Sequence, residues 1–424
     1  MLNKIKGTQD FLDLTLFNFI ITQAKQHLAL YNFQEVVTPI LEPTELFQRA
    51  VGEHTDVVSK EMFTIQPHGA APTEAAICLR PEHTAAMMRA YLENDLYNTL
   101  PQPWKAYTWG PMFRYERPQK GRFRQFHQIS LEIIGTANLA EDVLLISMLH
   151  HFFATKLQLD NYALQLNFLG TPTDRAAYRT KLITFLTQVA DQICETCRGR
   201  SSKNPLRIFD CKSPTCQAVY QQAPLLIDSL SAESQAEWAL LQAQLALLSI
   251  SFVVNPRLVR GLDYYHKTVF EFVSGDLGAQ NSFCGGGRYD QLASLLGHKQ
   301  DYPAVGCGIG IERLLLLLES QTNRLRLPTQ LALTVLIPLS ADQVTLGLLL
   351  TEQLHSKNLC TELLLELGSL KSMLRKAHRL GAKFVALIGA DEQAAQTVTV
   401  KNMLTSSSET VPQAGLADYL LRAV

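Results

Sequence analysis

One segment of the 424-residue chain concentrates cations in a way that suits phosphate chemistry. Residues 114–124 read Arg-Tyr-Glu-Arg-Pro-Gln-Lys-Gly-Arg-Phe-Arg, with five positive side chains against one acid. Pro118 and Gly121 predict a loop between two strands rather than a helix face. Next come the ring of Phe126 and three polar side chains that alternate at a period of two and so share one strand face: Gln128, Ser130 and Glu132. A solvated basic hairpin is the plain alternative, but this combination favours an ATP-dependent reaction over a bare RNA clamp.

Three later segments add candidate functional groups. Residues 260–265 read Arg-Gly-Leu-Asp-Tyr-Tyr, and residues 284–290 read Cys-Gly-Gly-Gly-Arg-Tyr-Asp. The triple glycine is either a mobile turn or a place where backbone approaches another group closely. Residues 306–314 read Gly-Cys-Gly-Ile-Gly-Ile-Glu-Arg-Leu, whose glycine spacing and context do not fit a dinucleotide fingerprint. A strand followed by a helix, with Arg313 near the helix start, instead fits an arginine directed at a triphosphate.

The elements that must position these groups follow from hydrophobic periodicity. We predict a helix over residues 11–31, a strand over 34–39 that ends at a proline, and strands over 104–109 and 126–134 on either side of the basic loop. Residues 173–248 change to Gln/Ala/Leu-rich helical texture and indicate a helical insertion. An apolar helix is expected over 311–319. The first domain is therefore predicted to span 1–322, with a polar linker over 323–330.

Residues 331–424 predict a second, smaller domain. Strands over 333–337, 361–365 and 384–388 alternate with helices over 341–355 and 370–380, which indicates a parallel or mixed α/β fold. Three cations recur every four residues on the second helix: Lys371, Arg375 and Arg379. No acidic residue lies between Leu367 and Ala390. A solvated amphipathic helix and an RNA-binding face are both compatible with this pattern.

Composition limits the class of protein. The formal net charge of −1 and the hydrophobic share of 47% indicate a globular chain without a global field for nucleic acid, so any RNA surface must be local. The first residues lack the apolar core of a signal peptide, and the uncharged stretch 238–254 contains polar residues and reads as a helix followed by a strand. We expect a soluble, cytoplasmic protein.

Four of the eight cysteines are close in sequence: Cys194, Cys197, Cys211 and Cys216. A CxxC pair followed by a second pair is compatible with zinc. The second pair is spaced CxxxxC, however, there is no nearby histidine, and residues 204–210 resemble ordinary packed structure. We therefore predict no bound metal and a reducing compartment with free thiols.

Taken together, these segments resemble the signatures of class II aminoacyl-tRNA synthetases. Residues 114–128 are similar to the second motif of the class and residues 308–314 to the third, while the first motif is matched loosely around Pro39. Residues 258–265, Leu-Val-Arg-Gly-Leu-Asp-Tyr-Tyr, resemble a segment of the histidine-specific members that their class II relatives lack. The resemblance covers essentially the whole chain and is of the bacterial type.

The resemblance implies a fold and a reaction. The fold is α/β overall: an α+β catalytic domain with an antiparallel sheet flanked by helices and a helical insertion, followed by an α/β anticodon-binding domain. The reaction is the activation of histidine with ATP to histidyl-adenylate and its transfer to tRNA(His). Mg²⁺ would accompany ATP, and no tightly bound cofactor is expected. The resemblance further implies a homodimer, with neither membrane nor DNA as a partner.

Roles for individual residues follow from the same resemblance. Arg114 would bind the α-phosphate and the substrate carboxylate, Arg122 and Arg313 the outer phosphates, and Phe126 the adenine. Arg260 would stabilise charge at the α-phosphate. The histidine ligands would be Glu82, Thr84 and Gln128 for the ammonium, and Glu132, Tyr265 and Tyr264 around the imidazole. The tRNA contacts would be Gln119, Lys120, Lys371, Arg375 and Arg379. The chain departs from the bacterial pattern at His83, where glycine is usual; this side chain either alters the loop or points to solvent.

Two alternatives remain. A non-catalytic relative that regulates histidine biosynthesis would keep the catalytic fold but lose motif residues and the anticodon domain. A class II enzyme for another amino acid, such as threonine or proline, would not be expected to carry residues 260–265 in this form.

Overall fold

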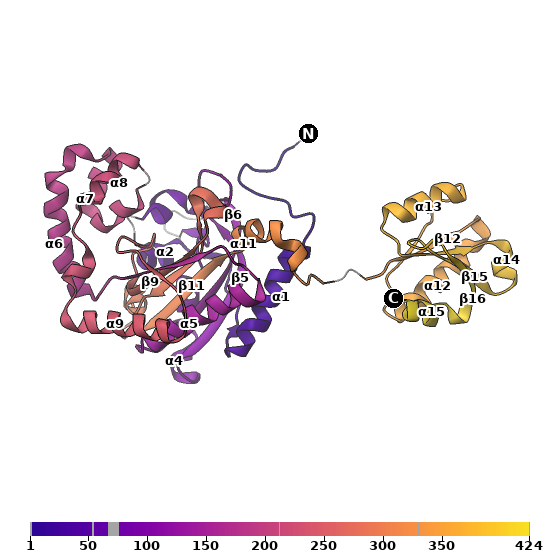
Figure 1. The fold of residues 1–424 in the computed structure, drawn as a ribbon, viewed down its shortest axis with the longest axis horizontal. Helices are drawn as coiled ribbons and strands as arrows, with labels where there is room; N and C mark the ends of the chain where they lie inside the picture. Colours follow the sequence, from indigo (N-terminus) through magenta and orange to yellow (C-terminus); the bar gives the residue numbers. More distant parts are fainter. Residues whose placement is uncertain (1, 53–54, 67–75, 212, 329–330, 424) are drawn as a thin grey trace. The chain divides into compact units, whose positions relative to one another are not determined.

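The computed structural model describes residues 2–52, 55–66, 76–211, 213–328 and 331–423. These fall into two compact units, Met1–Leu327 and Pro328–Val424 (Figure 1). Residues 329 and 330 of the expected linker lie outside the described residues. No helix in the described ranges is long and apolar enough to cross a membrane.

An eight-stranded sheet forms the centre of the first unit. Its six inner strands are antiparallel, and the two short edge strands, β1 and β8, pair in parallel with their neighbours. In spatial order the strands are β1 (Gln34–Glu35), β5 (Trp104–Phe113), β6 (Gln125–Ile134), β11 (Ala304–Gly310), β10 (Ser282–Arg288), β9 (His266–Val273), β7 (Ala163–Phe168) and β8 (Val253–Val254). The predicted antiparallel sheet and the two strands around the basic loop are therefore confirmed.

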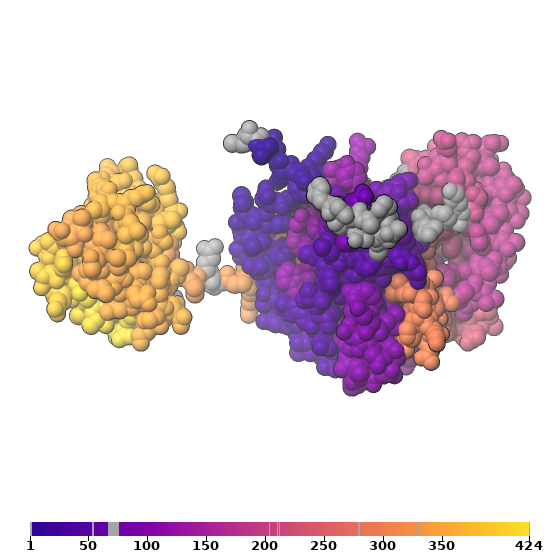
Figure 2. Space-filling view, turned by 180° about the vertical axis from the view of Figure 1, so that it is seen from behind, coloured from indigo at the N-terminus to yellow at the C-terminus, as the bar shows by residue number. Residues whose placement is uncertain are grey.

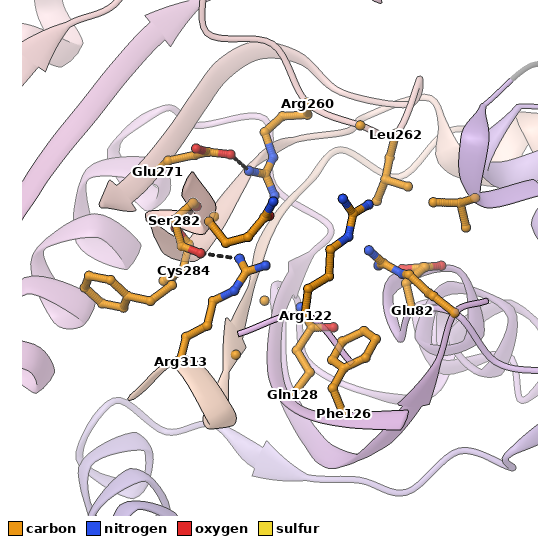
Figure 3. A pocket seen from close by; sticks show the side chains of 18 of the residues that line it. Glu82, Arg122, Phe126, Gln128, Arg260, Leu262, Glu271, Ser282, Cys284 and Arg313 are labelled. Atoms are coloured by element: carbon orange, nitrogen blue, oxygen red, sulfur yellow. Dashed lines mark hydrogen bonds and ion pairs between the residues drawn. The ribbon is translucent and has the colours of Figure 1, made fainter. Parts of the chain in front are cut away.

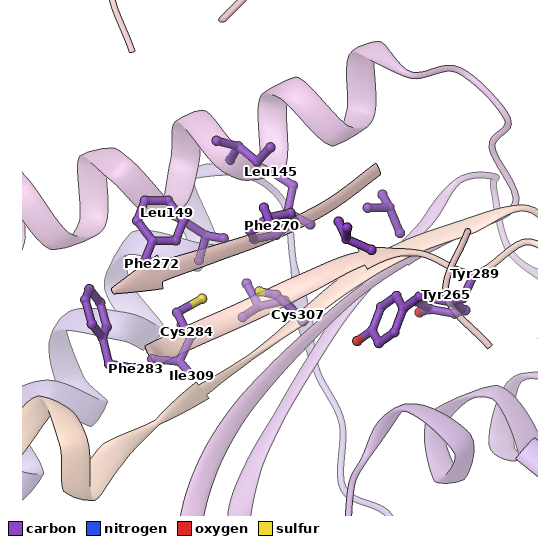
Figure 4. Packing of buried hydrophobic residues seen from close by; sticks show 14 of the residues in the cluster. Leu145, Leu149, Tyr265, Phe270, Phe272, Phe283, Cys284, Tyr289, Cys307 and Ile309 are labelled. Carbon is purple, nitrogen blue, oxygen red and sulfur yellow. The ribbon is translucent and has the colours of Figure 1, made fainter. Parts of the chain in front are cut away.

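One face of this sheet packs against apolar helices. Leu145 and Leu149 of α5 (Ala140–His151) lie over Phe270 and Phe272 of β9 (Figure 4). Since side chains alternate along a strand, Glu271 between the two phenylalanines points to the opposite face. The helices α1 (Thr15–Leu30) and α11 (Ile311–Leu318) contribute to the same core. The residues that alternate with this apolar face, such as Glu271, therefore point to the other side of the sheet and are available to bind a ligand.

A small three-stranded sheet flanks the central one. Its strands are β2 (Leu41–Pro43), β4 (Ile77–Leu79) and β3 (Phe63–Ile65) in spatial order. The helix α2 (Thr44–Val51) contacts β2 and α3 (Thr84–Glu93), and α3 in turn contacts α4 (Leu96–Thr99) and α10 (Leu292–Leu295). The strand expected over 34–39 is shorter than predicted, because the carbonyl oxygens of Thr38 and Pro39 accept from Arg80 at 2.7 and 3.3 Å rather than continuing the ladder.

Four helices occupy the region of the expected insertion: α6 (Pro172–Gln188), α7 (Glu195–Lys203), α8 (Pro214–Tyr220) and α9 (Ala232–Leu247). They lie on the flank of the first unit away from α1 (Figures 1 and 2). α6 begins with a capping box, in which Thr171 and Asp174 exchange hydrogen bonds. α7 and α8 are much shorter and are separated by a 3₁₀ turn, Pro205–Asp210.

The second unit contains a five-stranded mixed sheet, which is one of the two arrangements, parallel or mixed, that the sequence predicted. Parallel strands β13 (Thr361–Leu363), β12 (Thr334–Pro338) and β14 (Phe384–Ile388) are followed by antiparallel β15 (Thr397–Asn402) and β16 (Ser408–Pro412). The helices α12 (Val344–Ser356) and α15 (Leu416–Ala423) pack on one face, α13 (Leu370–Arg379) packs on the other, and α14 (Ala390–Ala394) precedes β15.

Candidate active site

A cavity of about 750 Å³ opens on the sheet face of the first unit opposite α5 (Figure 3). This volume lies within the usual range for sites that hold small molecules and nucleotides. Strands β6, β10 and β11 contribute to its wall, together with the loop 260–265, the start of α3 and part of the insertion. Elements from distant parts of the sequence therefore meet at one polar chamber.

Four guanidinium groups converge on this cavity: Arg114, Arg122, Arg260 and Arg313. The Arg114 side chain donates to the Pro81 carbonyl at 2.9 Å and lies over the Phe126 ring, 5.4 Å from its centroid. Burial and the neighbouring Arg114 lower the pKa of Arg313 to about 10. Because these cations repel one another, a bound polyanion would relieve the repulsion.

Arg122 and Arg313 are held by the hairpin turn and by the neighbouring strand. Arg122 forms an ion pair with Glu116, and its backbone pairs with Gln119 across Gly121, whose φ of +71° favours glycine. Arg313 follows the β11–α11 junction, as predicted, and donates from Nε to the Gly121 carbonyl at 3.0 Å. It also donates to the Ser282 carbonyl of β10 (Figure 3). The contact between the hairpin turn and the start of α11 therefore places the guanidiniums of Arg122 and Arg313 at the same cavity.

Arg260 is oriented by a carboxylate that projects from the central sheet. Its guanidinium pairs with Glu271 of β9 (Figure 3) and lies 5.6 Å from the centroid of the Tyr265 ring. Burial lowers the pKa of Arg260, but the charge of Glu271 and smaller contributions from Tyr265 and Tyr264 together outweigh it, and the net shift of the pKa is upward. An added Cβ at Gly285 of β10 would lie 2.7 Å from Arg260 Cζ, so the guanidinium rests directly on strand backbone. The triple glycine is part of a strand, and the mobile-turn alternative is wrong.

The polar end of the cavity is organised around the start of α3. The Glu82 carboxylate accepts from the backbone N–H groups of Thr84 and Ala85 at 2.6 and 2.8 Å, and burial raises its pKa. Gln128 of β6 lines the same end. His83 is 1% exposed and its Nδ1 lies 3.0 Å from Ser130 Oγ, so the solvent-facing alternative for His83 is wrong.

Glu132 lies deeper than its neighbours on the same strand face. The Glu132 side chain is not among those that line the cavity. Thr84 Oγ1 donates to one of its carboxylate oxygens at 2.6 Å, and the Tyr289 hydroxyl donates to the other. Burial raises the pKa of Glu132 to about 8. The alternation of Gln128, Ser130 and Glu132 is therefore realised, with Thr84 standing between the carboxyl group and the open volume.

Two aromatic side chains close this end. Tyr264 and Tyr265 are 3% and 5% exposed, and their ring centroids lie 4.6 Å apart. The Tyr264 hydroxyl and His83 Nε2 are buried at the cavity without a hydrogen-bond partner among the described residues. Buried polar atoms of this kind are normally satisfied, so the cavity presents groups that are ready for a polar ligand.

The expected tRNA contacts lie outside the cavity. Gln119 and Lys120 are exposed at the tip of the hairpin turn in the first unit. Three exposed cations of the second unit lie on α13, whose Met373 and Ala377 face the core: Lys371, Arg375 and Arg379. The neighbouring Lys376 is paired with Glu366 at 2.8 Å, so part of the charge on this helix is neutralised.

Several cavity residues carried no role in the sequence analysis. Glu271 of β9 lines the cavity but lies outside the segments singled out above, and Tyr289, just after the glycine run, donates to Glu132 behind it. Strand alternation around each residue was the signal that could have identified them. Other cavity residues come from the insertion and from remote strands: Phe209, Cys211, Gln217, Gln165 and Asn255. Local sequence offers no signal for these, because only tertiary packing brings them to the site.

Comparison with known proteins identifies similar chains over the full length. Residues 63–322 match the model of the tRNA synthetase class II core domain (G, H, P, S and T), and residues 334–423 match the anticodon binding domain. A histidine–tRNA ligase of Thermodesulfovibrio yellowstonii is 42% identical over 95% of this chain and 94% of its own. A second, from Synechococcus, is 40% identical over 99% of both. The crystal structure of apo Staphylococcus aureus histidyl-tRNA synthetase matches with a TM-score of 0.81 at 32% identity, covering 99% of both chains.

Proposed function

Because the chain belongs to the histidine–tRNA ligases within the class II aminoacyl-tRNA synthetases, we propose that its cavity carries both steps of that activity. In the first step the histidine carboxylate attacks the α-phosphate of ATP, a P–O bond forms, and pyrophosphate leaves. In the second, a terminal ribose hydroxyl of tRNA(His) attacks the histidyl carbonyl, and AMP leaves. The observation that carries the proposal is the convergence of four guanidiniums on one chamber beside unpartnered polar groups.

The phosphate end uses Arg114, Arg122 and Arg313. Phosphoryl transfer needs little covalent help from the protein, and catalysis comes from positioning and from charge that matches the developing anion. Arg114 binds the α-phosphate and the histidine carboxylate, Arg122 and Arg313 hold the outer phosphates, and Phe126 stacks on adenine. ATP enters as its Mg²⁺ complex, for which Glu271 at the cavity offers carboxylate oxygens.

Arg260 acts on the α-phosphate as charge develops there. Its guanidinium is already fixed by Glu271 and by the floor at Gly285, so little reorganisation accompanies the reaction. Besides offering oxygens to the Mg²⁺ complex of ATP, Glu271 therefore positions Arg260 for this step.

The histidine end uses groups around α3 and the two tyrosines. Glu82, Thr84 and Gln128 receive the α-ammonium, and Tyr264, Tyr265 and Glu132 surround the imidazole. The free Tyr264 hydroxyl supports this placement. Glu132 reaches the ring once the Thr84 hydroxyl turns away from it. An amino acid that leaves these buried groups unpaired is rejected at a cost of several kcal/mol, on the order of the penalty for unsatisfied polar groups.

The remaining assignments concern the partners. Gln119 and Lys120 contact the tRNA near its acceptor end, and the cations of α13 contact its anticodon region through phosphates, which makes binding dependent on salt. A homodimer in the cytoplasm completes the proposal, in keeping with an aminoacyl-tRNA synthetase whose eight cysteines form no disulfide.

ATP–pyrophosphate exchange with each of the twenty amino acids tests the function directly. We expect exchange with histidine alone. Exchange with a different amino acid would contradict the substrate assignment, and no exchange at all would favour the regulatory relative. Arg260→Ala is expected to slow adenylate formation about 10²–10³-fold while ATP still binds. Arg324→Ala, which removes a surface ion pair to Asp160 in the same unit, serves as the matched control.

A further inference from the structure

Four cysteine sulfurs meet inside the insertion, away from the groups assigned to the reaction. Cys194 precedes α7, Cys197 lies within it, Cys211 follows the 3₁₀ turn, and Cys216 lies in α8. All four Sγ atoms lie within 4.8 Å of one another, and those of Cys194 and Cys211 are 4.0 Å apart. The CxxC pair in the sequence was compatible with such a cluster, but the spacing of the second pair argued against it.

The separations are compatible with a four-sulfur metal site and are too long for disulfides. A zinc ion with four sulfur ligands at about 2.3 Å holds them at tetrahedral corners about 3.8 Å apart. A disulfide requires about 2.05 Å between two sulfurs. Contraction of the four-sulfur cluster by less than about 1 Å on each edge would complete a tetrahedron, and four protein ligands would leave no open position, as in structural sites.

The helices α7 and α8 bury few side chains of their own, although Ile208 of the 3₁₀ turn between them is part of the core. α7 reads Glu-Thr-Cys-Arg-Gly-Arg-Ser-Ser-Lys, and Cys197 is the buried side chain among its described residues. In α8 the buried side chains are Cys216 and Tyr220. A bound metal adds stability where helices bury so little apolar surface of their own. Each helix therefore contributes its cysteine as a principal inward contact.

The surroundings suit thiolate ligands. The backbone N–H of Cys194 donates to Cys216 Sγ at 3.2 Å, and that of Ser213 donates to Cys211 Sγ at 3.5 Å. Such donors orient thiolates and offset their charge in metal sites. Cys197 and Cys216 are buried, and the rings of Phe209 and Tyr220, which lie near Cys211 and Cys216 in the sequence, pack edge to face at 5.9 Å between centroids.

The segment that the cluster would fix reaches the catalytic cavity. Between Cys197 and Cys211, Arg200 donates to Asp56 at 2.7 Å and Asn204 donates to Asp263 at 2.8 Å. Asp263 belongs to the loop that carries Arg260, and Cys211 itself lines the cavity. Cross-linking the insertion at the four sulfurs therefore holds one wall of the site against the Arg260 loop.

We propose that Cys194, Cys197, Cys211 and Cys216 bind one Zn²⁺ as a closed tetrathiolate site that anchors the insertion against the catalytic loop. Binding forms four Zn–S bonds and releases the thiol protons to solvent. This replaces the prediction of no bound metal, which rested on the CxxxxC spacing of the second pair, on the lack of a nearby histidine and on the packed appearance of residues 204–210. The spacing does not matter, because the 3₁₀ turn and the start of α8 return Cys211 and Cys216 to α7.

Metal content of the full-length chain tests the proposal. The protein is purified under reducing conditions without chelator and analysed by elemental and native mass spectrometry, with one zinc per chain expected. Cys211→Ser and Cys216→Ser should each lose the metal. Cys360→Ser, which alters a half-buried thiol outside the cluster, should retain it. Exchange of zinc for Co²⁺ should give thiolate-to-cobalt charge transfer and the intense visible bands of tetrahedral cobalt, and both should be absent in Cys211→Ser.

Three results would overturn the proposal: reduced wild-type protein with no more zinc than Cys211→Ser, octahedral cobalt spectra, or intact-mass analysis showing two disulfides in place of four thiols. Histidine-dependent pyrophosphate exchange is measured on the same samples. Exchange with no bound zinc would contradict only the metal site, and zinc without exchange would contradict only the proposed function. If the serine variants fail to fold, thiol labelling of wild-type protein before and after chelation decides the matter: four thiols that become reactive on zinc release support the site, and four that react beforehand contradict it.

Discussion

The substitution Gly285→Ala tests whether the position of the Arg260 guanidinium matters, because it moves the guanidinium without removing it. Gly285 lies in extended strand β10, a backbone conformation that alanine adopts readily. The added Cβ would lie 2.7 Å from Arg260 Cζ and 2.8 Å from Nη2, closer than carbon atoms approach such groups. The guanidinium must move by about 1 Å to restore ordinary contact, and it turns away from the α-phosphate position or loosens from Glu271.

A displacement of about 1 Å from a productive geometry costs about 100-fold in rate, which is equivalent to about 2.7 kcal/mol. We expect single-turnover adenylate formation to slow by this factor, with ATP affinity little changed because Arg114, Arg122 and Arg313 stay in place. Gly275→Ala is the matched control, since an added Cβ there meets nothing within 4 Å. Thermal unfolding of each variant shows whether the fold is retained.

A double-mutant cycle with Arg260→Ala decides whether Gly285 acts through the arginine. Once the guanidinium is gone, Gly285→Ala should cost little more, so the two effects should be far from additive. Gly285 does not position Arg260 if Gly285→Ala is as active as the control, or if its full penalty persists in the Arg260→Ala background.

Three other outcomes follow from the site and the second unit. Gly308→Ala would place a Cβ 2.7 Å from Gln128 Cδ, so steady-state kinetics should show a raised KM for histidine and an unchanged KM for ATP. Burial raises the pKa of Glu132 from 4.5 to about 8, so the stability that its neutral form contributes is complete below pH 4.5 and lost as the pH rises through about 8. Glu132→Gln should therefore make the free energy of unfolding, measured by urea titration, less dependent on pH between these two values. Replacing Lys371, Arg375 and Arg379 by alanine should weaken tRNA binding and reduce its logarithmic salt slope by about 2 to 3, while Lys357→Ala, on the opposite face of the second unit, should not.

The sequence predicted those parts of the site in which local pattern and chemistry coincide. Period-two alternation placed Gln128, Ser130 and Glu132 on one face, and a glycine-rich strand before an apolar helix placed Arg313 at the helix start. The depth of Glu132 was not predictable, because it depends on how closely β11 approaches β6 at Gly306. The convergence of the four cysteines was likewise hidden, since irregular turns carry no period from which distance can be inferred.

The glycines of β10 and β11 explain why so many functional side chains fit into one cavity. Three of them lie beneath a functional group that would meet their Cβ: Gly285 beneath Arg260, Gly308 beneath Gln128 and Gly306 beneath Glu132. The floor of the site is therefore bare backbone, and the ligand-binding side chains rest on it in van der Waals contact. A rigid sheet floor fixes these groups before substrate arrives, which is the condition under which fixed charges stabilise a transition state without reorganisation. Specificity in this cavity thus depends on the residues that lack side chains as much as on the charged residues above them.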